Sequence, residues 1–346
     1  MTGSMTDGDL IDSVAKLEAV TGRPPPAMHL KVIDHLDEGA LRWLAQSTLV
    51  FVGLGSSLDA AKANVTATIG GGAPGFASGD ARRLRIPLAS LDNDEPPAVG
   101  ASFGSLFLIP GIREALRING RVEAVDADHV HVVVEECYGH CAKAIIRSDL
   151  WAAQPRDAPG NLADFVAASR FLALATVGAG GQADTSPKGD PAGCMAMLDG
   201  DRLWFADRPG NRRVDSFRNI VDQAQSGIVL LAPGTTHALT ARGRARLTTD
   251  MAIRERFATH GKTPLLAIEL PIEAISLEIS PALERASPWP VRQTNDIDPA
   301  KLFMDHIKLN RSGGVGGMIA RMSLSVPGMT GLLKKGLEKD YKDNLY

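Results

Sequence analysis

The 346 residues of the chain are about twice the length of an average domain of ~150 residues, so two domains are expected. The composition is 44% hydrophobic and 22% charged, which is ordinary for a globular protein and excludes wholesale disorder, collagen-like repetition and coiled coil. The net charge of -3 provides no general attraction for nucleic acid, so no nucleic-acid partner is expected.

No sequence feature predicts secretion or membrane insertion. The longest uncharged stretch, residues 96–112, is broken by proline, glycine and serine and would make a poor transmembrane helix. Acidic residues stand near the N-terminus, where a signal peptide would need basic ones. Three cysteines are too few for a disulfide scaffold. We therefore expect a cytoplasmic protein with no membrane partner.

Two helices are expected before the first strands. Residues 8–21 and 27–46 both place apolar side chains on one face at helical spacing. The proline-rich segment 22–26 separates the two.

Most of the remaining chain is expected to be β-rich. Short apolar runs such as 171–177 and 202–206 are bounded by glycine-rich turn signals, and this spacing favours a barrel or sandwich over a parallel sheet. The last ~50 residues differ from this pattern. There we expect a helix near 299–308, a glycine-rich hinge at 313–317 and an amphipathic stretch at 328–341.

The sequence also repeats itself weakly. Residues 106–121 and 229–244 both contain Pro-Gly-x3-Ala-Leu-x3-Gly-Arg after an apolar run, at a spacing of 123 residues. Residues 47–55 resemble residues 169–177 at a spacing of 122. Because the order of features is kept, we interpret the chain as a duplication.

A linker rich in proline and alanine, residues 152–160, is the clearest internal boundary. It divides the chain into a first copy with its leading helices, a second copy and a helical extension. The expected domains are residues 1–155, 156–295 and 296–346.

Two basic segments stand on either side of the expected strand at 203–206. The first is Ser186 to Asp190 (SPKGD) and the second is Arg208 to Arg213 (RPGNRR). Arginine forks make two-point contacts with a phosphate, lysine supplies a point charge, and the amides of a turn form an anion-binding nest. These segments predict a phosphate site, with a solvated basic turn as the alternative.

A second polar cluster, residues 136–151, contains Cys137, His140 and Cys141. It permits a metal site, but Cys-x3-Cys with an intervening histidine lacks the second ligand pair of a structural zinc site. Buried thiols beside a hydrogen-bonded histidine are the structural alternative. A catalytic thiol assisted by Lys143 and Arg147 is the third interpretation.

At these residues the chain resembles the pyridoxamine-phosphate-oxidase-like flavoproteins, which form the FMN-binding split-barrel superfamily. The motifs that carry the resemblance are Ser186 to Asp190, Asp207 to Arg213, the two Pro-Gly pairs, and Cys137 to Ala144. The resemblance covers about residues 8–290. It implies a mainly β fold with peripheral helices (α+β), in which two tandem split β-barrels pair as an intrachain pseudo-dimer around FMN.

The resemblance also implies roles for single residues. The FMN phosphate would be held from the second copy by Lys188, Asn211, Arg212 and Arg213, with Arg208 as a further cofactor-binding residue. Ser186 and Pro187 would run beside the flavin. The first copy would cover the ring with Cys137 and Cys141 and supply positive charge from Lys143 or Arg147. His140 and Tyr138 are the candidates for proton transfer or substrate contact.

Each copy departs from the family pattern in its own way. In the first copy, Thr66 and Thr68 replace Ser186 and Lys188, and Asn93-Asp94-Glu95 replaces Asn-Arg-Arg. Two acidic side chains there would repel a phosphate.

In the second copy, residues 278–286 (EISPALERA) replace the segment with Cys and His, and only Arg285 and Trp289 remain of its Arg…Trp ending. One copy has lost the phosphate half and the other has lost the capping half. We therefore expect one complete site and one defunct site.

The expected function is that of an FMN-dependent oxidoreductase acting on a small organic substrate, with NAD(P)H as electron donor. Pyridoxamine-phosphate oxidase activity itself is not expected, because the terminal Arg-x-His motif has no counterpart. Two alternatives stay open: a non-catalytic flavin or haem module, with His129, His131 or His140 as an axial ligand, and a metal-binding protein that uses the Cys/His cluster. Whether the chain forms a homodimer is also open.

Overall fold

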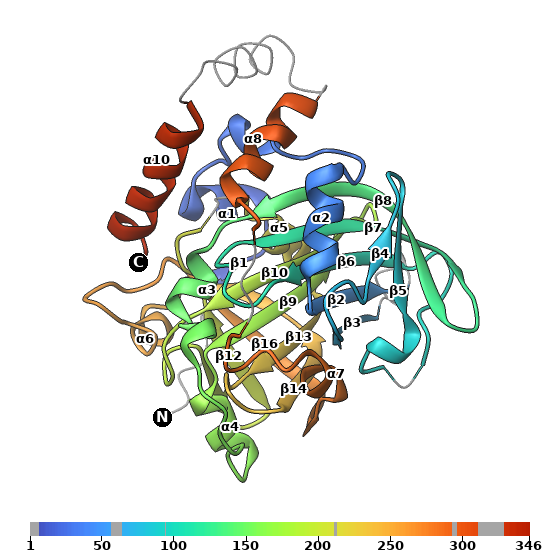
Figure 1. Ribbon diagram of the computed structural model, residues 1–346. Helices are drawn as coiled ribbons and strands as arrows, with labels where there is room; N and C mark the ends of the chain where they lie inside the picture. Colours follow the sequence, from blue (N-terminus) through green and yellow to red (C-terminus); the bar gives the residue numbers. More distant parts are fainter. Residues whose placement is uncertain (1–6, 57–63, 94, 211–212, 293–295, 311–328) are drawn as a thin grey trace.

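The strands of the chain form two antiparallel sheets, which lie against each other with helices around them (Figure 1). The computed structural model describes residues 7–56, 64–93, 95–210, 213–292, 296–310 and 329–346.

Within these residues, seven strands form the first sheet in the order β3-β2-β6-β7-β8-β5-β4. Their bounds are β2 (Leu49–Gly55), β3 (Val65–Gly71), β4 (Ser78–Gly79), β5 (Arg83–Pro87), β6 (Ser102–Leu108), β7 (Ala115–Val125) and β8 (His129–His140).

The second sheet follows the path β1-β15-β16-β14-β13-β9-β10, and β12 joins it by pairing with β16 and β11. Its bounds are β1 (Leu10–Ile11), β9 (Phe171–Val177), β10 (Ala183–Gly189), β11 (Ala196–Asp199), β12 (Arg202–Ala206), β13 (Gln225–Leu231), β14 (His237–Arg244), β15 (Arg246–Thr248) and β16 (Ala267–Ile279).

The two sheets share one connectivity. The path β3-β2-β6-β7-β8-β5 of the first corresponds, strand by strand along the chain, to β10-β9-β13-β14-β16-β12 of the second. The fold is therefore mainly β with curled sheets and few helices, as a split barrel requires.

The helices lie around the sheets (Figure 1). Their bounds are α1 (Val14–Thr21), α2 (Glu38–Gln46), α3 (Lys143–Arg147), α4 (Leu162–Ala168), α5 (Asp215–Asp222), α6 (Met251–Glu255), α7 (Pro281–Ala286), α8 (Pro299–Leu309) and α10 (Met329–Asp343). Short 3-10 turns cover η1 (Asp7–Asp9), η2 (Pro26–His29), η3 (Leu88–Ser90) and η4 (Leu150–Ala152). The expected hinge at 313–317 lies outside the described residues.

The N-terminal helices are shorter than the apolar spacing predicts. The helix expected over 8–21 begins at Val14, because Leu10–Ile11 pairs with β15 and Ser13 caps the first turn. The helix expected over 27–46 begins at Glu38, after the cap Asp37. Tertiary strand pairing has overridden helical periodicity at the first of these places.

The leading segment does not pack where the expected domain 1–155 would place it. Ile11 and Leu17 lie in the core of the second sheet, and Glu18 pairs with Arg218 on α5 at 2.6 Å. The N-terminal residues therefore cross to the second sheet.

A third apolar cluster joins the two sheets. It contains Phe51 and Leu106 of the first sheet together with Phe171 and Val229 of the second. The rings of Phe51 and Phe171 lie with their centroids 5.2 Å apart. Burial of this cluster fixes the sheets relative to each other.

Each sheet also ends against a helix of the other. A Cβ atom on Gly189, the last residue of β10, would lie 1.9 Å from the carbonyl oxygen of Ala144 on α3. A Cβ atom on Gly71, the last residue of β3, would lie 2.2 Å from that of Ala282 on α7. The two contacts are reciprocal, and both require glycine.

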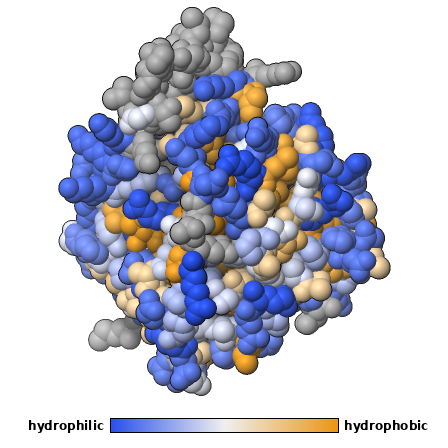
Figure 2. Space-filling model, viewed as in Figure 1, coloured by the Kyte–Doolittle hydropathy of each residue, from blue (hydrophilic) through white to orange (hydrophobic). Residues whose placement is uncertain are grey.

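The surface of the molecule is largely hydrophilic. Figure 2 shows hydrophilic side chains over most of one face, with separate hydrophobic patches between them. None of the described helices combines the length and the apolar character needed to cross a bilayer.

Candidate functional site

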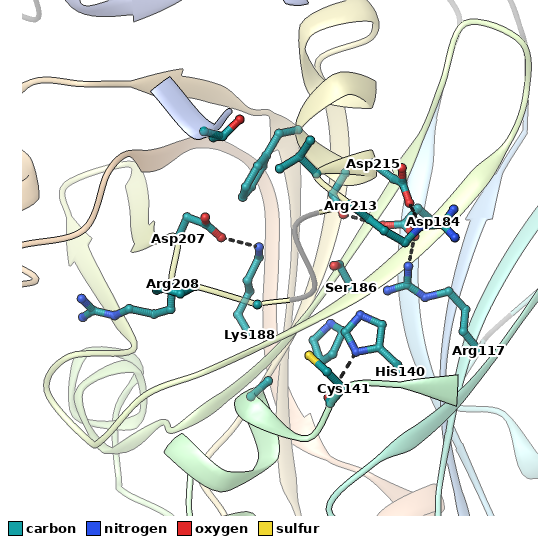
Figure 3. Close-up of a pocket in the computed structure, with 18 of the residues that line it drawn as sticks. Arg117, His140, Cys141, Asp184, Ser186, Lys188, Asp207, Arg208, Arg213 and Asp215 are labelled. Atoms are coloured by element: carbon teal, nitrogen blue, oxygen red, sulfur yellow. Dashed lines mark hydrogen bonds and ion pairs between the residues drawn. The ribbon is translucent and has the colours of Figure 1, made fainter. Parts of the chain in front are cut away.

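A cavity of about 360 Å³ lies where the two sheets meet, and we call it the interface cavity (Figure 3). The first sheet and α3 contribute Arg117, His140, Cys141, Ala144 and Arg147. The second sheet and the segment after β12 contribute Asp184, Ser186, Pro187, Lys188, Asp207, Arg208, Pro209, Gly210, Arg213, Val214, Asp215, Ser216 and Phe217.

Strand β10 explains why the Ser-Pro-Lys segment faces this cavity. It is an edge strand of the second sheet, so Pro187, which has no N–H to donate, is tolerated there. Side chains alternate along a strand, so Ser186 and Lys188 lie on one face. Both line the cavity.

The expected phosphate-binding cations differ in how they are held. Lys188 Nζ lies 3.0 Å from Asp207 Oδ1 and 4.2 Å from the centre of the Phe217 ring. Arg208 donates from Nε to Asp190 at 2.7 Å, and in Figure 3 its side chain points away from the middle of the cavity.

Arg213 lies on the opposite side of the cavity from Arg208 (Figure 3). It donates from Nε to Asp215 at 2.6 Å, and its guanidinium lies 4.5 Å from the centre of the Tyr138 ring. Asn211 and Arg212, the other two expected phosphate ligands, lie outside the described residues.

The lining carries more positive than negative charge. Its cations are Arg117, Arg147, Lys188, Arg208 and Arg213, against the carboxylates Asp184, Asp207 and Asp215. The described lining residues therefore carry a positive excess, although Arg208 is already paired with Asp190 just behind the lining.

Arg117 is a lining residue that the sequence analysis missed, as is its partner Asp184. It is 1% exposed, forms an ion pair with Asp184, and donates to Tyr138 Oη at 2.7 Å and to the Thr185 carbonyl at 2.6 Å. Burial opposes its charge, but Asp184 and Tyr138 outweigh burial and raise the pKa of the guanidinium. A signal was available in the repeat, where the second copy has Thr240 at this place.

Cys137 does not reach the cavity, so its expected contact with a cofactor is corrected. It is fully buried in the core of the first sheet, and its backbone pairs with Ile33. Burial raises the pKa of its thiol. Alternation along β8 turns Cys137 to the face opposite Tyr138.

Tyr138 lies beneath the cavity without lining it. Its hydroxyl accepts a hydrogen bond from Arg117, and burial raises its pKa. The fully buried ring also lies under the guanidinium of Arg213. Tyr138 therefore positions two arginines in this structure, instead of the expected substrate contact.

His140 and Cys141 line the interface cavity and also a second, neighbouring cavity. His140 Nδ1 lies 3.4 Å from the Cys141 carbonyl oxygen. Burial, followed by the charges of Arg117 and Lys31, lowers the pKa of His140 well below its usual value. The imidazole is therefore neutral at pH 7.

Lys143 and Arg147 were both expected to supply charge to the flavin ring, and the structure separates them. Lys143 Nζ lies 2.8 Å from Asp340 on α10, and Lys143 lines the second cavity instead of the interface cavity. Arg147 lines the interface cavity and donates to the carbonyl oxygens of Gly189, Pro209 and Leu345 at 2.9, 2.9 and 2.7 Å. Lys143 therefore pairs with α10 and does not line the interface cavity.

Strand pairing corrects the alignment of the two copies by two residues. Leu49 pairs with Gly71, and Phe171 with Gly189, so Gly71 corresponds to Gly189. Thr68 therefore stands where the second copy has Ser186, and Gly70 where it has Lys188. The first copy therefore still lacks a cation where the second copy has Lys188, because Gly70 has no side chain.

A smaller crevice of about 270 Å³ lies at the corresponding place on the other side of the molecule. It is lined by Thr66, Ala67, Thr240, Ala241, Arg242, Ala274, Ile275 and Ser276. By strand register, the threonines Thr66 and Thr240 stand where the interface cavity has Asp184 and Arg117. The crevice therefore lacks the buried ion pair. Within Asn93-Asp94-Glu95, Asp94 lies outside the described residues.

The histidines considered as haem or metal ligands are dispersed. His131 Nε2 lies 2.7 Å from Asp126 near one end of β8, and His129 is beside it. His140 lies at the other end of the same strand. Among the described residues, no three His, Cys, Asp or Glu side chains are grouped closely enough to hold a metal ion.

Residues 158–278 match the family model of pyridoxamine 5'-phosphate oxidase. This segment has the pyridoxamine 5'-phosphate oxidase-like fold. It contains β9 to β15 and nearly all of β16, and so includes the strand β10 that faces the interface cavity. No curated protein matches the chain.

Solved structures similar to the chain cover about a third of it. HupZ from Group A Streptococcus is 20% identical over 33% of this chain and 88% of its own, with a TM-score of 0.28. General Stress Protein 26 from Bacillus anthracis is 14% identical over 33% and 89%, with a TM-score of 0.26. An F420 reductase is 18% identical over 34% and 98%, with a TM-score of 0.27.

Proposed function

We propose that the chain is a flavin-dependent oxidoreductase that binds one FMN in the interface cavity and reduces a small organic substrate with electrons from NAD(P)H. The observation that carries the proposal is the convergence of cations from both sheets on one cavity. Arg117 and Arg147 come from the first sheet and α3, and Lys188 and Arg213 come from the second sheet and the segment after it.

A duplicated, internally paired architecture is part of this proposal. The reciprocal contacts of Gly189 with α3 and Gly71 with α7 support it, as does a matching pair of hydrogen bonds. Arg147 Nε donates to the Gly189 carbonyl at 2.9 Å, and Arg285 Nε donates to the Gly71 carbonyl at 3.1 Å. We assign the paired units to residues 1–155 and 156–295, apart from the N-terminal residues that cross over, with 296–346 as an extension.

The residues present fit an FMN phosphate. A phosphate monoester carries between one and two negative charges near pH 7, which the positive excess of the lining would attract. Lys188 and Arg213 both line the cavity, where Asp207 and Asp215 hold them. Arg117 Nε is buried without a hydrogen-bond partner, a further donor at this site.

Bound FMN would supply hydride and electron transfer. The chain would supply charge and orientation: Arg117 and Arg147 stabilise negative charge that develops in the cavity. His140, neutral at pH 7, would offer a hydrogen bond at the wall shared by the two cavities, because burial and the nearby cations disfavour its protonated form. Lys143 has no such role here, because it is paired with Asp340. We also propose a cytoplasmic location, which suits three free cysteines.

The test is the absorption spectrum of the purified protein. We expect flavin bands near ~450 nm, of the kind that bound flavins show. Lys188→Ala should lower flavin occupancy several-fold, whereas Lys301→Ala, an exposed lysine on α8, should leave it unchanged. A Soret band in place of the flavin bands, or full flavin retention in Lys188→Ala, would overturn the assignment.

A further inference from the structure

A second cavity of about 540 Å³ adjoins the interface cavity, and we call it the lateral cavity. The two share four lining residues, His140, Cys141, Pro209 and Gly210. The rest of its wall is mostly apolar, with Pro25, Met28, Trp43, Pro299, Leu302 and Phe303. A ligand there would lie beside the proposed flavin site.

Most of this wall comes from outside the segment with the pyridoxamine 5'-phosphate oxidase-like fold. That segment covers residues 158–278, whereas the wall uses the N-terminal segment, α2, α8 and α10. The cavity is therefore built largely by residues outside the family match.

Lys31 is buried in this wall. It is 4% exposed, and its ammonium donates to the Gly139 carbonyl oxygen at 2.8 Å. The ammonium also lies 5.4 Å from the centre of the Tyr138 ring and 5.6 Å from that of Phe303. A lysine ammonium has three N–H donors, and among the described residues no carboxylate lies within ion-pair distance of it.

The other charged groups of the lateral cavity have partners of their own. Lys143 pairs with Asp340 at 2.8 Å, and Glu114, whose pKa burial raises, shares a hydrogen bond with Tyr341. Lys31 therefore differs from Lys143: it is a buried cation without a carboxylate partner among the described residues, and the acidic group that most favours its charge is the Cys141 thiol in the same wall. Buried charges are costly unless they are paired.

We propose that the lateral cavity binds an apolar, aromatic-sized carboxylate whose oxygens pair with Lys31, and that this ligand class is the substrate. The carboxylate supplies the missing counter-ion and acceptors, and the apolar body packs on Leu302 and Phe303. The shared wall at His140 and Cys141 places this ligand next to the interface cavity. Its identification as substrate rests on the proposed function; its binding does not.

Binding is tested on the full chain with 2-naphthoate and its uncharged counterpart, 2-naphthamide, by isothermal titration calorimetry. We expect wild type to prefer the carboxylate by about tenfold or more, because the carboxylate would form a buried charge pair with Lys31. Lys31→Met should abolish this preference. Lys301→Met, on the exposed side of α8, should keep it.

A second variant tests the cavity and leaves Lys31 unsubstituted. Gly139 lies on β8 in the wall, and a Cβ atom there would meet only the Leu302 side chain, at 3.9 Å. Gly139→Leu should therefore fold, fill the cavity and weaken 2-naphthoate at least tenfold. It carries the test alone if Lys31→Met does not fold.

The proposal is overturned if wild type shows no preference for the carboxylate, if Lys31→Met keeps the preference, or if Gly139→Leu binds 2-naphthoate as wild type does. Flavin content is measured on the same preparations. Lys31-dependent binding without any flavin would refute the proposed function and leave the lateral cavity intact. Bound flavin without Lys31-dependent binding of 2-naphthoate would refute the proposed ligand of the lateral cavity and leave the proposed function standing.

Discussion

Arg117 ties the two sheets together at the level of a single side chain. It stands on β7 of the first sheet, and its guanidinium reaches Asp184 and Thr185 on β10 of the second. Ser216 also donates to Asp184. A charge buried to this extent is tolerated because the Asp184 carboxylate and the hydrogen bonds to Tyr138 and Thr185 offset its desolvation.

Breaking this pair should be costly. Arg117→Met leaves Asp184 charged and buried, so we expect a loss of roughly 3 to 5 kcal/mol in the free energy of unfolding. Asp184→Asn should cost a similar amount, and the double variant much less than the sum. Urea denaturation measures all three. Arg83→Met, which breaks the exposed pair with Glu123, should cost under about 1 kcal/mol; equal losses in the two pairs would contradict this account.

Lys31 should make stability depend on pH. Burial lowers its pKa to about 8, from about 10.4 in an unfolded chain. The cost of the buried charge is therefore full below pH 8 and disappears as the pH rises to about 10.4. Lys31→Met removes this cost, so the variant should be more stable than wild type by roughly 1 to 3 kcal/mol at pH 7.

That advantage should narrow between pH 8 and about 10.4, and denaturant unfolding at several pH values measures it. A difference that stays constant across this window would mean that the Lys31 ammonium is already matched in the folded protein. Lys301→Met serves as the control, because its ammonium is exposed.

Among the elements, strands were more predictable from the sequence than helices. The run 171–177 is β9 and the run 202–206 is β12, because turn signals bound each of them. The repeat spacing of 122 to 123 residues also holds for β2 with β9 and β6 with β13. The first helices were overestimated, since β1 pairs with β15 across more than 230 residues, which a local pattern cannot reveal.

The candidate site could be predicted only in part. The sequence could predict that Ser186 and Lys188 share a face, because side chains alternate along a strand. Both line the cavity. The same alternation on β8 separates Cys137 from Tyr138 and could have excluded the cysteine. The pairing of Lys143 with Asp340 depends on where α10 docks, which no motif specifies.

The reciprocal glycines allow an element-level prediction with an internal control. Gly189→Ala and Gly71→Ala each place a Cβ atom against a helix carbonyl, at 1.9 and 2.2 Å, so α3 or α7 must shift. We expect both to lower the melting temperature by several degrees. Gly160→Ala, which meets no atom within 4 Å, should not.

The two variants should differ in flavin affinity. Gly189 adjoins Lys188 and accepts from Arg147, so its substitution should weaken FMN several-fold in a fluorescence titration. Gly71 lies at the corresponding place beside the smaller crevice, and its substitution should leave FMN affinity unchanged. Equal weakening by both would mean that the effect is general destabilisation.

At the scale of the whole molecule, the two sheets have the same strand order but differ in the charged residues at corresponding positions. The interface cavity has Lys188, Arg117 and Asp184 where the first copy and the smaller crevice have Gly70, Thr240 and Thr66. Strand order alone would allow two equivalent sites per chain. The interface cavity is lined by five cations, whereas the smaller crevice is lined by one, Arg242, which donates to Asn64 at 2.7 Å, so we expect the anion in the interface cavity.

We therefore expect one FMN per chain. Flavin released by denaturation, quantified against protein concentration, should give a ratio near one, with native mass spectrometry reporting the oligomer. The ratio should hold in a monomeric fraction from size-exclusion chromatography, because both sets of lining residues belong to the same chain. A homodimer would then carry two flavins. Two flavins per monomer, or flavin confined to a dimeric fraction, would contradict a single site completed within one chain.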